Sequence, residues 1–102
     1  MTRCELYINL LSTNCRAAEL ERTSARIRKA AENLQAELNG ISANWQGIAS
    51  RAYTDKGVTL VRKMQAEARH LNQTAETIRR IAKRTYDAEI KALETANQRA
   101  YH

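Results

Sequence analysis

Small and apolar residues recur every three or four positions through the first part of the chain, and charged residues lie between them. This stripe alternates steps of four and three from Leu6 to Trp45. Such spacing keeps the side chains on one face of a helix and is typical of two helices packed at a shallow left-handed angle. The stripe consists of Leu6, Leu10, Thr13, Ala17, Leu20, Ser24, Ile27, Ala31, Leu34, Leu38, Ile41 and Trp45.

A second stripe follows in the later part of the chain. Its members are Ile48, Ala52, Leu60, Met64, Ala68, Leu71, Ala75, Ile78, Ala82 and Thr85. No proline interrupts either stripe. Gly57 lies inside the second one, where glycine costs about 1 kcal/mol relative to alanine, so we expect either a close neighbour or a local irregularity there. The pattern predicts helices over about residues 4–39 and 47–97.

The segment between the two predicted helices, residues 40–46, has the composition of a bend. Gly40 is expected to end the first helix in the left-handed conformation, because it has no Cβ to clash. Ser42 or Asn44 is expected to cap the second helix. Gly47, two residues after Trp45, is expected to let the opposite helix or the indole approach the backbone. The sequence therefore predicts an all-α fold, an antiparallel two-helix hairpin in a single domain.

More apolar side chains are present near the amino end than one partner helix requires. Ile8, Leu11, Cys15 and Ala18 form a further stripe, expected beside the first. We therefore expect a second molecule to cover it and the hairpin to dimerise. The residues expected to form helix–helix contacts are Leu6, Ile8, Leu10, Leu11, Leu20, Ile27, Leu34, Leu38, Leu60, Met64, Leu71 and Ile78.

The net charge is +6 and is concentrated in the later part of the chain. A basic face at Arg79, Arg80, Lys83 and Arg84 is compatible with an acidic partner, or with the phosphates of a nucleic acid. No aromatic residue is interleaved for base stacking, and acidic residues break the patch. The sequence therefore favours a solvated or partner-facing surface over nucleic-acid binding.

Few residues carry reactive chemistry. Cys4 and Cys15 are eleven positions apart, roughly 16 Å along one helix, which is too far for a disulfide between them. We expect two reduced cysteines, with Cys15 half-buried. His70 and His102 are isolated from each other, so no catalytic, cofactor or metal site is predicted. No secretory signal is apparent, and no apolar run reaches the eighteen or so residues that a membrane span needs.

The central residues Trp45-Gln46-Gly47, in a chain of this length between two long helices, resemble the motif of the WXG family of small type VII secretion substrates, the ESAT-like helical hairpins. The small and aromatic residues from Ile48 to Tyr53 are similar to those that follow the family's motif. The resemblance implies a four-helix bundle made from two hairpins and export by a secretion ATPase without a cleaved signal peptide. It also implies a role as effector partner, targeting factor or secreted adaptor.

Two features depart from the family's usual pattern. Many members carry a Tyr-x-x-x-Asp/Glu export signal, whereas Tyr86 is followed four residues later by Ile90. Members are also often acidic, and this chain is basic. Both departures favour a subtype that pairs with an acidic partner, similar to the small helical proteins that accompany the helical domains of LXG toxins.

Overall fold

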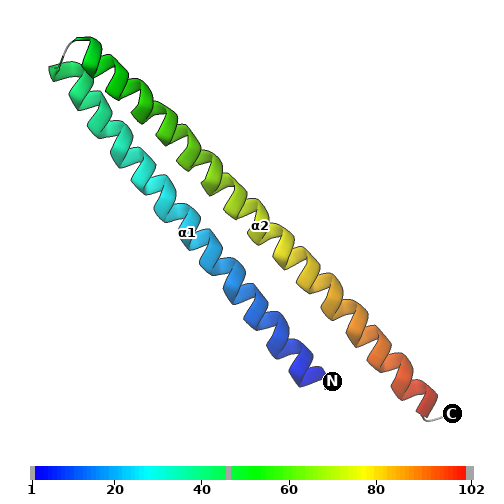
Figure 1. Ribbon diagram of the computed structural model, residues 1–102. Helices are drawn as coiled ribbons and strands as arrows, with labels where there is room; N and C mark the ends of the chain where they lie inside the picture. Colours follow the sequence, from blue (N-terminus) through cyan, green and yellow to red (C-terminus); the bar gives the residue numbers. More distant parts are fainter. Residues whose placement is uncertain (1, 46, 101–102) are drawn as a thin grey trace. The chain divides into compact units, whose positions relative to one another are not determined.

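The computed structural model describes residues 2–45 and 47–100, which form two helices (Figure 1). Helix α1 spans Arg3–Asn44 and helix α2 spans Ile48–Ala100. They run antiparallel, which confirms the predicted all-α hairpin. The chain divides into two compact units. The terminal unit contains Met1–Leu20 and Gln73–His102, and the bend unit contains Glu21–Asn72.

Helix α1 begins with a cap supplied by Thr2. The backbone N–H of Glu5 donates to Thr2 Oγ1 over 3.1 Å, and the N–H of Leu6 donates to the Thr2 carbonyl over 3.1 Å. Thr followed three residues later by Glu is the sequence of a capping box, which satisfies N–H groups that the first turn leaves unpaired. The cap explains why α1 starts one residue before the expected position.

The core of the bend unit is a narrow seam between the two helices. Buried Ala31, Leu38 and Val61 form its centre, and Leu34, Val58 and Met64 pack against them. Fully buried Ser24 donates its hydroxyl hydrogen to the Ala68 carbonyl over 2.7 Å. The small residues Ser24, Ala31 and Ala68 let the two backbones approach closely. The Ser24 hydroxyl has an acceptor in the Ala68 carbonyl, so it does not remain unpaired in the seam.

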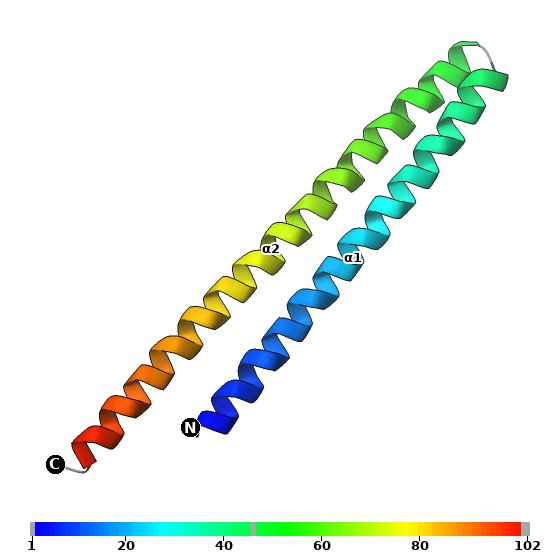
Figure 2. The same cartoon turned by 180° about the vertical axis from the view of Figure 1, so that it is seen from behind.

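The terminal unit has a seam of the same kind. Figure 2 shows the early part of α1 beside the late part of α2. Leu6, Ala17 and Ala75 are buried. An exposed ion pair joins Arg3 Nη2 to Glu94 Oε1 over 2.8 Å, a type of contact that usually contributes less than about 1 kcal/mol. Packing of the apolar seam therefore holds this unit together.

The predicted stripe on α1 agrees closely with the observed burial. Every member from Leu6 to Ile41 is buried or half-buried, and only Trp45 is exposed. The face of α1 that contacts α2 was thus readable from the spacing of apolar and small residues alone.

The predicted stripe on α2 is wrong over its first part. Ile48, Ala52 and Leu60 are exposed. The inner positions there are instead Ser50, Thr54, Gly57, Val58 and Val61. From Met64 to Ala82 the prediction and the observed burial agree again, but Thr85, the last predicted member, is exposed. The error arises because three of the true inner residues are polar or lack a side chain, so an apolar pattern passes over them.

Gly57 provides the close approach that the sequence left open. A Cβ atom at this position would lie 2.5 and 2.7 Å from the two Cδ atoms of Leu38. The missing side chain therefore forms a hollow on α2 that the Leu38 side chain fills.

Candidate functional site

The connection between the helices lies later in the chain than the sequence predicts. Gly40 does not end α1, which continues to Asn44. The Trp45 N–H donates to the Ile41 carbonyl over 2.8 Å, and Asn44 Nδ2 donates to the Gly40 carbonyl over 3.0 Å. The extra helical turn places Ile41 half-buried on the seam. Burial of its side chain offsets the cost of about 1 kcal/mol for keeping a glycine in a helix.

Gly47 makes the turn and caps α2. Its φ of 140° lies in a region that residues with a side chain rarely adopt. Its carbonyl accepts the first hydrogen bond of α2, from the Arg51 N–H over 3.1 Å. Ser42 and Asn44, the predicted caps, lie within α1 instead. Nothing lies within 4 Å of a Cβ built on Gly47, so the expected close approach is wrong. Glycine is needed there for its backbone conformation.

The two glycines are expected to respond in opposite ways to alanine. Gly47→Ala should destabilise the hairpin by about 1–3 kcal/mol, because alanine is strained at the observed φ. Gly40→Ala should stabilise it by up to about 1 kcal/mol, since Gly40 is helical and nothing lies within 4 Å of its Cβ position. Urea unfolding followed by circular dichroism measures both. A loss of stability in Gly40→Ala would contradict the placement of the turn.

An exposed apolar surface surrounds the turn, and we call Trp45, Ile48 and Tyr53 the bend surface. Trp45 is 50% exposed, so it is not the core residue expected at the end of the seam. Its ring lies 6.4 Å from that of Tyr53 at an interplanar angle of 54°, a tilted arrangement favourable for aromatic pairs. Ile48 is 88% exposed. The bend unit thus presents three large apolar side chains to solvent beside its turn.

Ser50 holds this surface in place, and sequence reasoning missed it. The side chain is buried, and its hydroxyl donates to the Trp45 carbonyl over 2.5 Å. The bond joins the first turn of α2 to the residue after α1. The capping box places a Glu or Gln that accepts a hydrogen bond at this third helical position, whereas Ser50 donates to a carbonyl, so no capping signal in the sequence pointed to it.

The predicted contact residues fall into three groups by exposure. Leu6 and Leu38 are buried within the hairpin. The half-buried members are Leu10, Leu20, Ile27, Leu34, Met64, Leu71 and Ile78. The exposed members are Ile8, Leu11 and Leu60. Contacts with a second molecule therefore remain a prediction, carried mainly by the exposed and half-buried positions.

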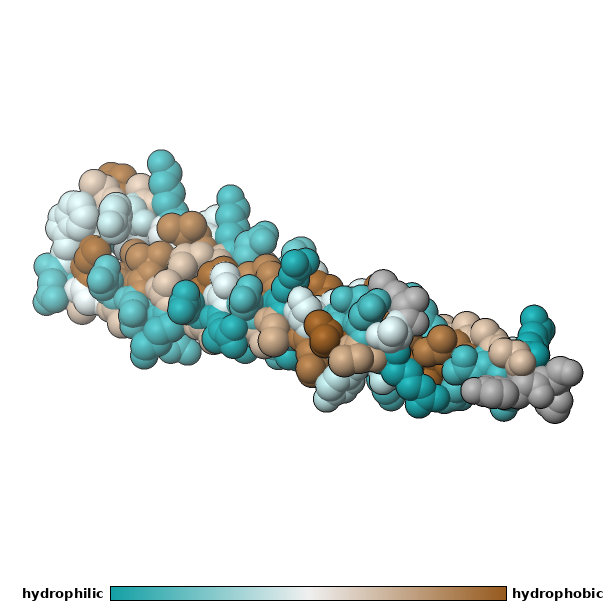
Figure 3. Space-filling view, turned by 90° about the horizontal axis from the view of Figure 1, so that it is seen from below, coloured by the Kyte–Doolittle hydropathy of each residue, from teal (hydrophilic) through white to brown (hydrophobic). Residues whose placement is uncertain are grey.

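A groove of about 350 Å³ opens between the helices of the terminal unit. Leu6 and Leu10 of α1 and Ile78, Ile81 and Ala82 of α2 contribute to its lining. In the space-filling view, brown apolar residues lie among teal hydrophilic ones on the face shown (Figure 3). The terminal unit thus leaves part of its seam uncovered.

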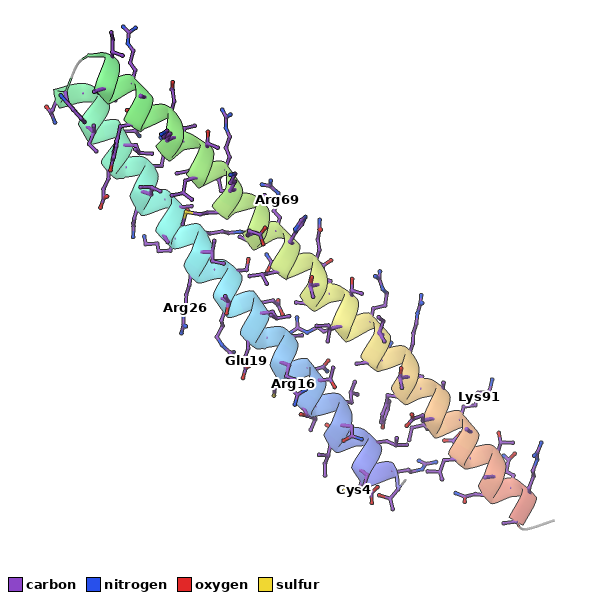
Figure 4. The ribbon with its side chains drawn as sticks, viewed as in Figure 1. Cys4, Arg16, Glu19, Arg26, Arg69 and Lys91 are labelled. Carbon is purple, nitrogen blue, oxygen red and sulfur yellow. The ribbon has the colours of Figure 1, made fainter. Side chains whose placement is uncertain are left out.

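The cysteines differ from expectation in one respect. Both Cys4 and Cys15 are free, and both are exposed, so a half-buried Cys15 is wrong. Figure 4 places Cys4 at the edge of α1 that faces away from α2. Among residues 2–45 and 47–100, no three His, Cys, Asp or Glu side chains gather as a possible metal site.

The basic face lies on α2 within the terminal unit. Arg79 is half-buried, while Arg80, Lys83 and Arg84 are exposed. Arg80 Nη2 donates to Thr77 Oγ1 over 3.4 Å. Figure 4 shows Lys91 further along the same helix, pointing away from α1. A search of the described helices for a segment apolar and long enough to cross a membrane found none.

Comparison with known proteins identifies a family for this chain. Residues 14–96 match the family model WXG100, described as proteins of 100 residues with WXG. No curated protein and no solved structure matches the chain. The matched range contains the turn, the bend surface and most of both helices. The chain therefore belongs to the WXG100 family, whose members are non-enzymatic substrates of type VII secretion.

Proposed function

We propose that the protein is a secretion-associated helical hairpin, exported without a cleaved signal peptide either as a substrate or as the targeting partner of an effector. The bend surface is the observation that carries this proposal. Trp45 of the family motif is half-exposed beside Tyr53, on a turn fixed by Gly47. Two aromatic side chains that pack on each other beside the turn that caps α2 are suited to recognition, because they lose few rotamers on binding. The secretion ATPase is the proposed reader of this surface.

The proposed partner is a related hairpin, or the helical domain of an LXG-type effector, which completes a four-helix bundle by helix–helix packing. The uncovered groove between Leu6, Leu10 and Ile78 supports this, because a partner helix would bury its apolar lining. The net charge of +6 favours an acidic partner. Such a partner would also supply the acidic export signal that this chain lacks after Tyr86.

The charge pattern gives less support to the alternative of a basic cytoplasmic coiled coil that binds nucleic acid. At roughly 100° per residue, the cations from Arg79 to Arg84 spread over about 140° of the helix. Glu76 and Asp87 fall within that arc. Carboxylates inside the patch would repel phosphates, so an acidic protein partner suits this face better.

Trp45→Ala is expected to lower the exported fraction about tenfold, since truncating a buried anchor tryptophan at an interface commonly costs 1.4 kcal/mol or more. The measurement is the ratio of protein in culture medium to protein in cells. Helicity should change little, because the indole is half-exposed and packs on Tyr53. Tyr7→Ala is the matched control, because it removes an aromatic side chain of nearly the same exposure, 51%, that lies outside the bend surface.

Deleting the secretion ATPase gene supplies the second arm of this test. Export should then cease for the wild-type chain and for the Tyr7→Ala variant alike. Wild-type levels outside the ATPase-deficient cell would refute the proposed route, whatever the result with Trp45→Ala.

A further inference from the structure

Helix α1 carries an exposed stripe on the side away from α2, formed by Cys4, Ile8, Leu11 and Cys15, which we call the outer stripe. Ile8 is 57% and Leu11 46% exposed, and both cysteines are exposed. At 3.6 residues per turn, the stripe lies about 150° around the helix from the seam that contains Leu6. The sequence prediction placed it beside the seam, whereas it lies nearly opposite. Neither the seam nor the groove of the terminal unit uses it.

The outer stripe is bounded at its carboxyl end. Continuing its spacing along α1 leads through Ala18 to Arg22 and, further on, to Lys29. The part of the stripe from Cys4 to Cys15 thus covers about three helical turns, with a cysteine at each end. Its length and its end residues both need an explanation.

The spacing of the outer stripe is palindromic, with steps of four, three and four. Suppose that a two-fold axis passes between Asn9 and Leu10 and relates two copies of α1. Each residue then faces the residue of the other copy for which the two residue numbers add up to 19. Cys4 then faces Cys15 of a second copy, and Ile8 faces Leu11 of that copy. A surface that is complementary to itself under a two-fold rotation is the requirement for a symmetric dimer.

The residues that flank the middle of the outer stripe are compatible with this pairing. The same axis brings Glu5 opposite Asn14 of the second copy and Tyr7 opposite Ser12 of that copy. No like charges meet at these two positions, whereas Arg3 comes opposite Arg16 of the second copy beside each cysteine, and their repulsion weakens the noncovalent pairing.

We propose that two copies pair antiparallel through the outer stripe, and that Cys4 of each copy forms a disulfide with Cys15 of the other. Packed helices have axes about 8–10 Å apart, and their Cα atoms lie about 2.3 Å from each axis. Facing Cα atoms are then roughly 3.4–5.4 Å apart, and the upper part of that interval overlaps the range of about 4.4–6.8 Å that a disulfide needs. This contact goes beyond the proposed function, because it uses the side of α1 opposite to α2 and does not depend on export.

A small-molecule disulfide is the oxidant for each bridge. The Cys4 thiolate attacks one sulfur of the oxidant, which forms a mixed disulfide and releases one small thiolate. The Cys15 thiolate of the second copy then attacks the Cys4 sulfur and releases the second small thiolate. The two protons lost by the cysteines pass to the two released thiolates, so each bridge consumes one oxidant and yields two small thiols.

The two bridges compensate for a short interface. Four side chains from each copy bury less than the roughly 1,000 Å² expected of a stable complex. Noncovalent pairing through the outer stripe is therefore weak, and the covalent dimer depends on the redox state. The oxidising environment outside a cell would favour it.

Complementation between single-cysteine variants of the full chain tests the register. Wild type, Cys4→Ser and Cys15→Ser are each incubated with oxidised glutathione and examined by non-reducing electrophoresis and intact mass. Wild type should give a dimer with two bridges, and each variant alone should give little. An equimolar mixture of the two variants should recover a dimer with one bridge, between Cys15 of the first variant and Cys4 of the second. Efficient dimers from either variant alone, or none from the mixture, would overturn the proposal.

A charged substitution tests whether the apolar stripe directs the bridging. Ile8→Lys should slow wild-type disulfide formation about tenfold, because the ammonium group opposes burial against Leu11 of the second copy. Ile48→Lys, at an exposed site of the bend unit, should leave the rate unchanged. Equal rates in both variants would show that the cysteines react by random collision and would refute the pairing. Neither result depends on whether the protein is exported.

Discussion

Replacing Leu38 with alanine is expected to lower the free energy of unfolding by about 2–5 kcal/mol, the usual range for a fully buried leucine. Leu38 is 1% exposed and lies in the centre of the bend unit with Ala31 and Val61. Most of the other buried residues of this unit are alanine or serine, and Leu38 is its largest fully buried side chain. Urea unfolding monitored by circular dichroism, at fixed protein concentration under reducing conditions, measures the effect.

Leu60→Ala is the matched control for this substitution. Leu60 is 51% exposed, so its truncation should cost less than about 1 kcal/mol. The sequence pattern had assigned both leucines to helix contacts. Equal losses from the two variants would show that the register of the bend unit is misplaced.

Gly57→Ala is expected to destabilise the wild-type chain although alanine is the better helix former. Its Cβ would lie 2.5 Å from Leu38 Cδ2, 2.7 Å from Cδ1 and 3.1 Å from Cγ. Relieving such overlap in a packed seam typically costs about 1–3 kcal/mol. This cost should outweigh the gain of up to about 1 kcal/mol from removing a helical glycine. Urea unfolding of the single variant gives the net value.

The sign of this effect should reverse when Leu38 is absent. The three atoms nearest to the new Cβ all belong to the Leu38 side chain beyond its Cβ, so in the Leu38→Ala background Gly57→Ala should stabilise the chain by up to about 1 kcal/mol. The two substitutions are then strongly non-additive, as expected for side chains in direct contact. Additive effects within about 0.5 kcal/mol would contradict the packing of Leu38 into the hollow at Gly57.

The sequence was most informative where packing depends on side chains that are recognisably apolar or small. The stripe from Leu6 to Ile41 was correct at every position. The first part of α2 was misread because Ser50 and Gly57 carry no apolar signal although both face the seam. Gly57 faces the seam because Leu38 of α1 packs into its place, and Ser50 because its hydroxyl bonds to the Trp45 carbonyl across the turn. Neither contact is encoded in an apolar pattern.

The turn shows a second limit of sequence reasoning. Gly40 has the propensity to end a helix, but burial of Ile41 keeps the helix going for another turn. Gly47 was singled out correctly as important, and the reason was wrong, because its role is a backbone conformation and not close packing. The motif around Trp45 was recognised in advance, while the Ser50 bond that fixes its backbone was not. Pairing with a second hairpin stays a prediction.

The hollow at Gly57 has a consequence for how the two helices align in the bend unit. Two helices with a regular seven-residue repeat can pack in several alignments of nearly equal free energy, because moving one helix by seven residues brings similar side chains opposite each other. Only one position on α2 lacks a side chain where the Leu38 isobutyl group enters. Slippage by one repeat would remove that group from its cavity and press it against Ser50 or Met64. A single absent methyl group therefore selects one alignment from several that the repeat alone would allow.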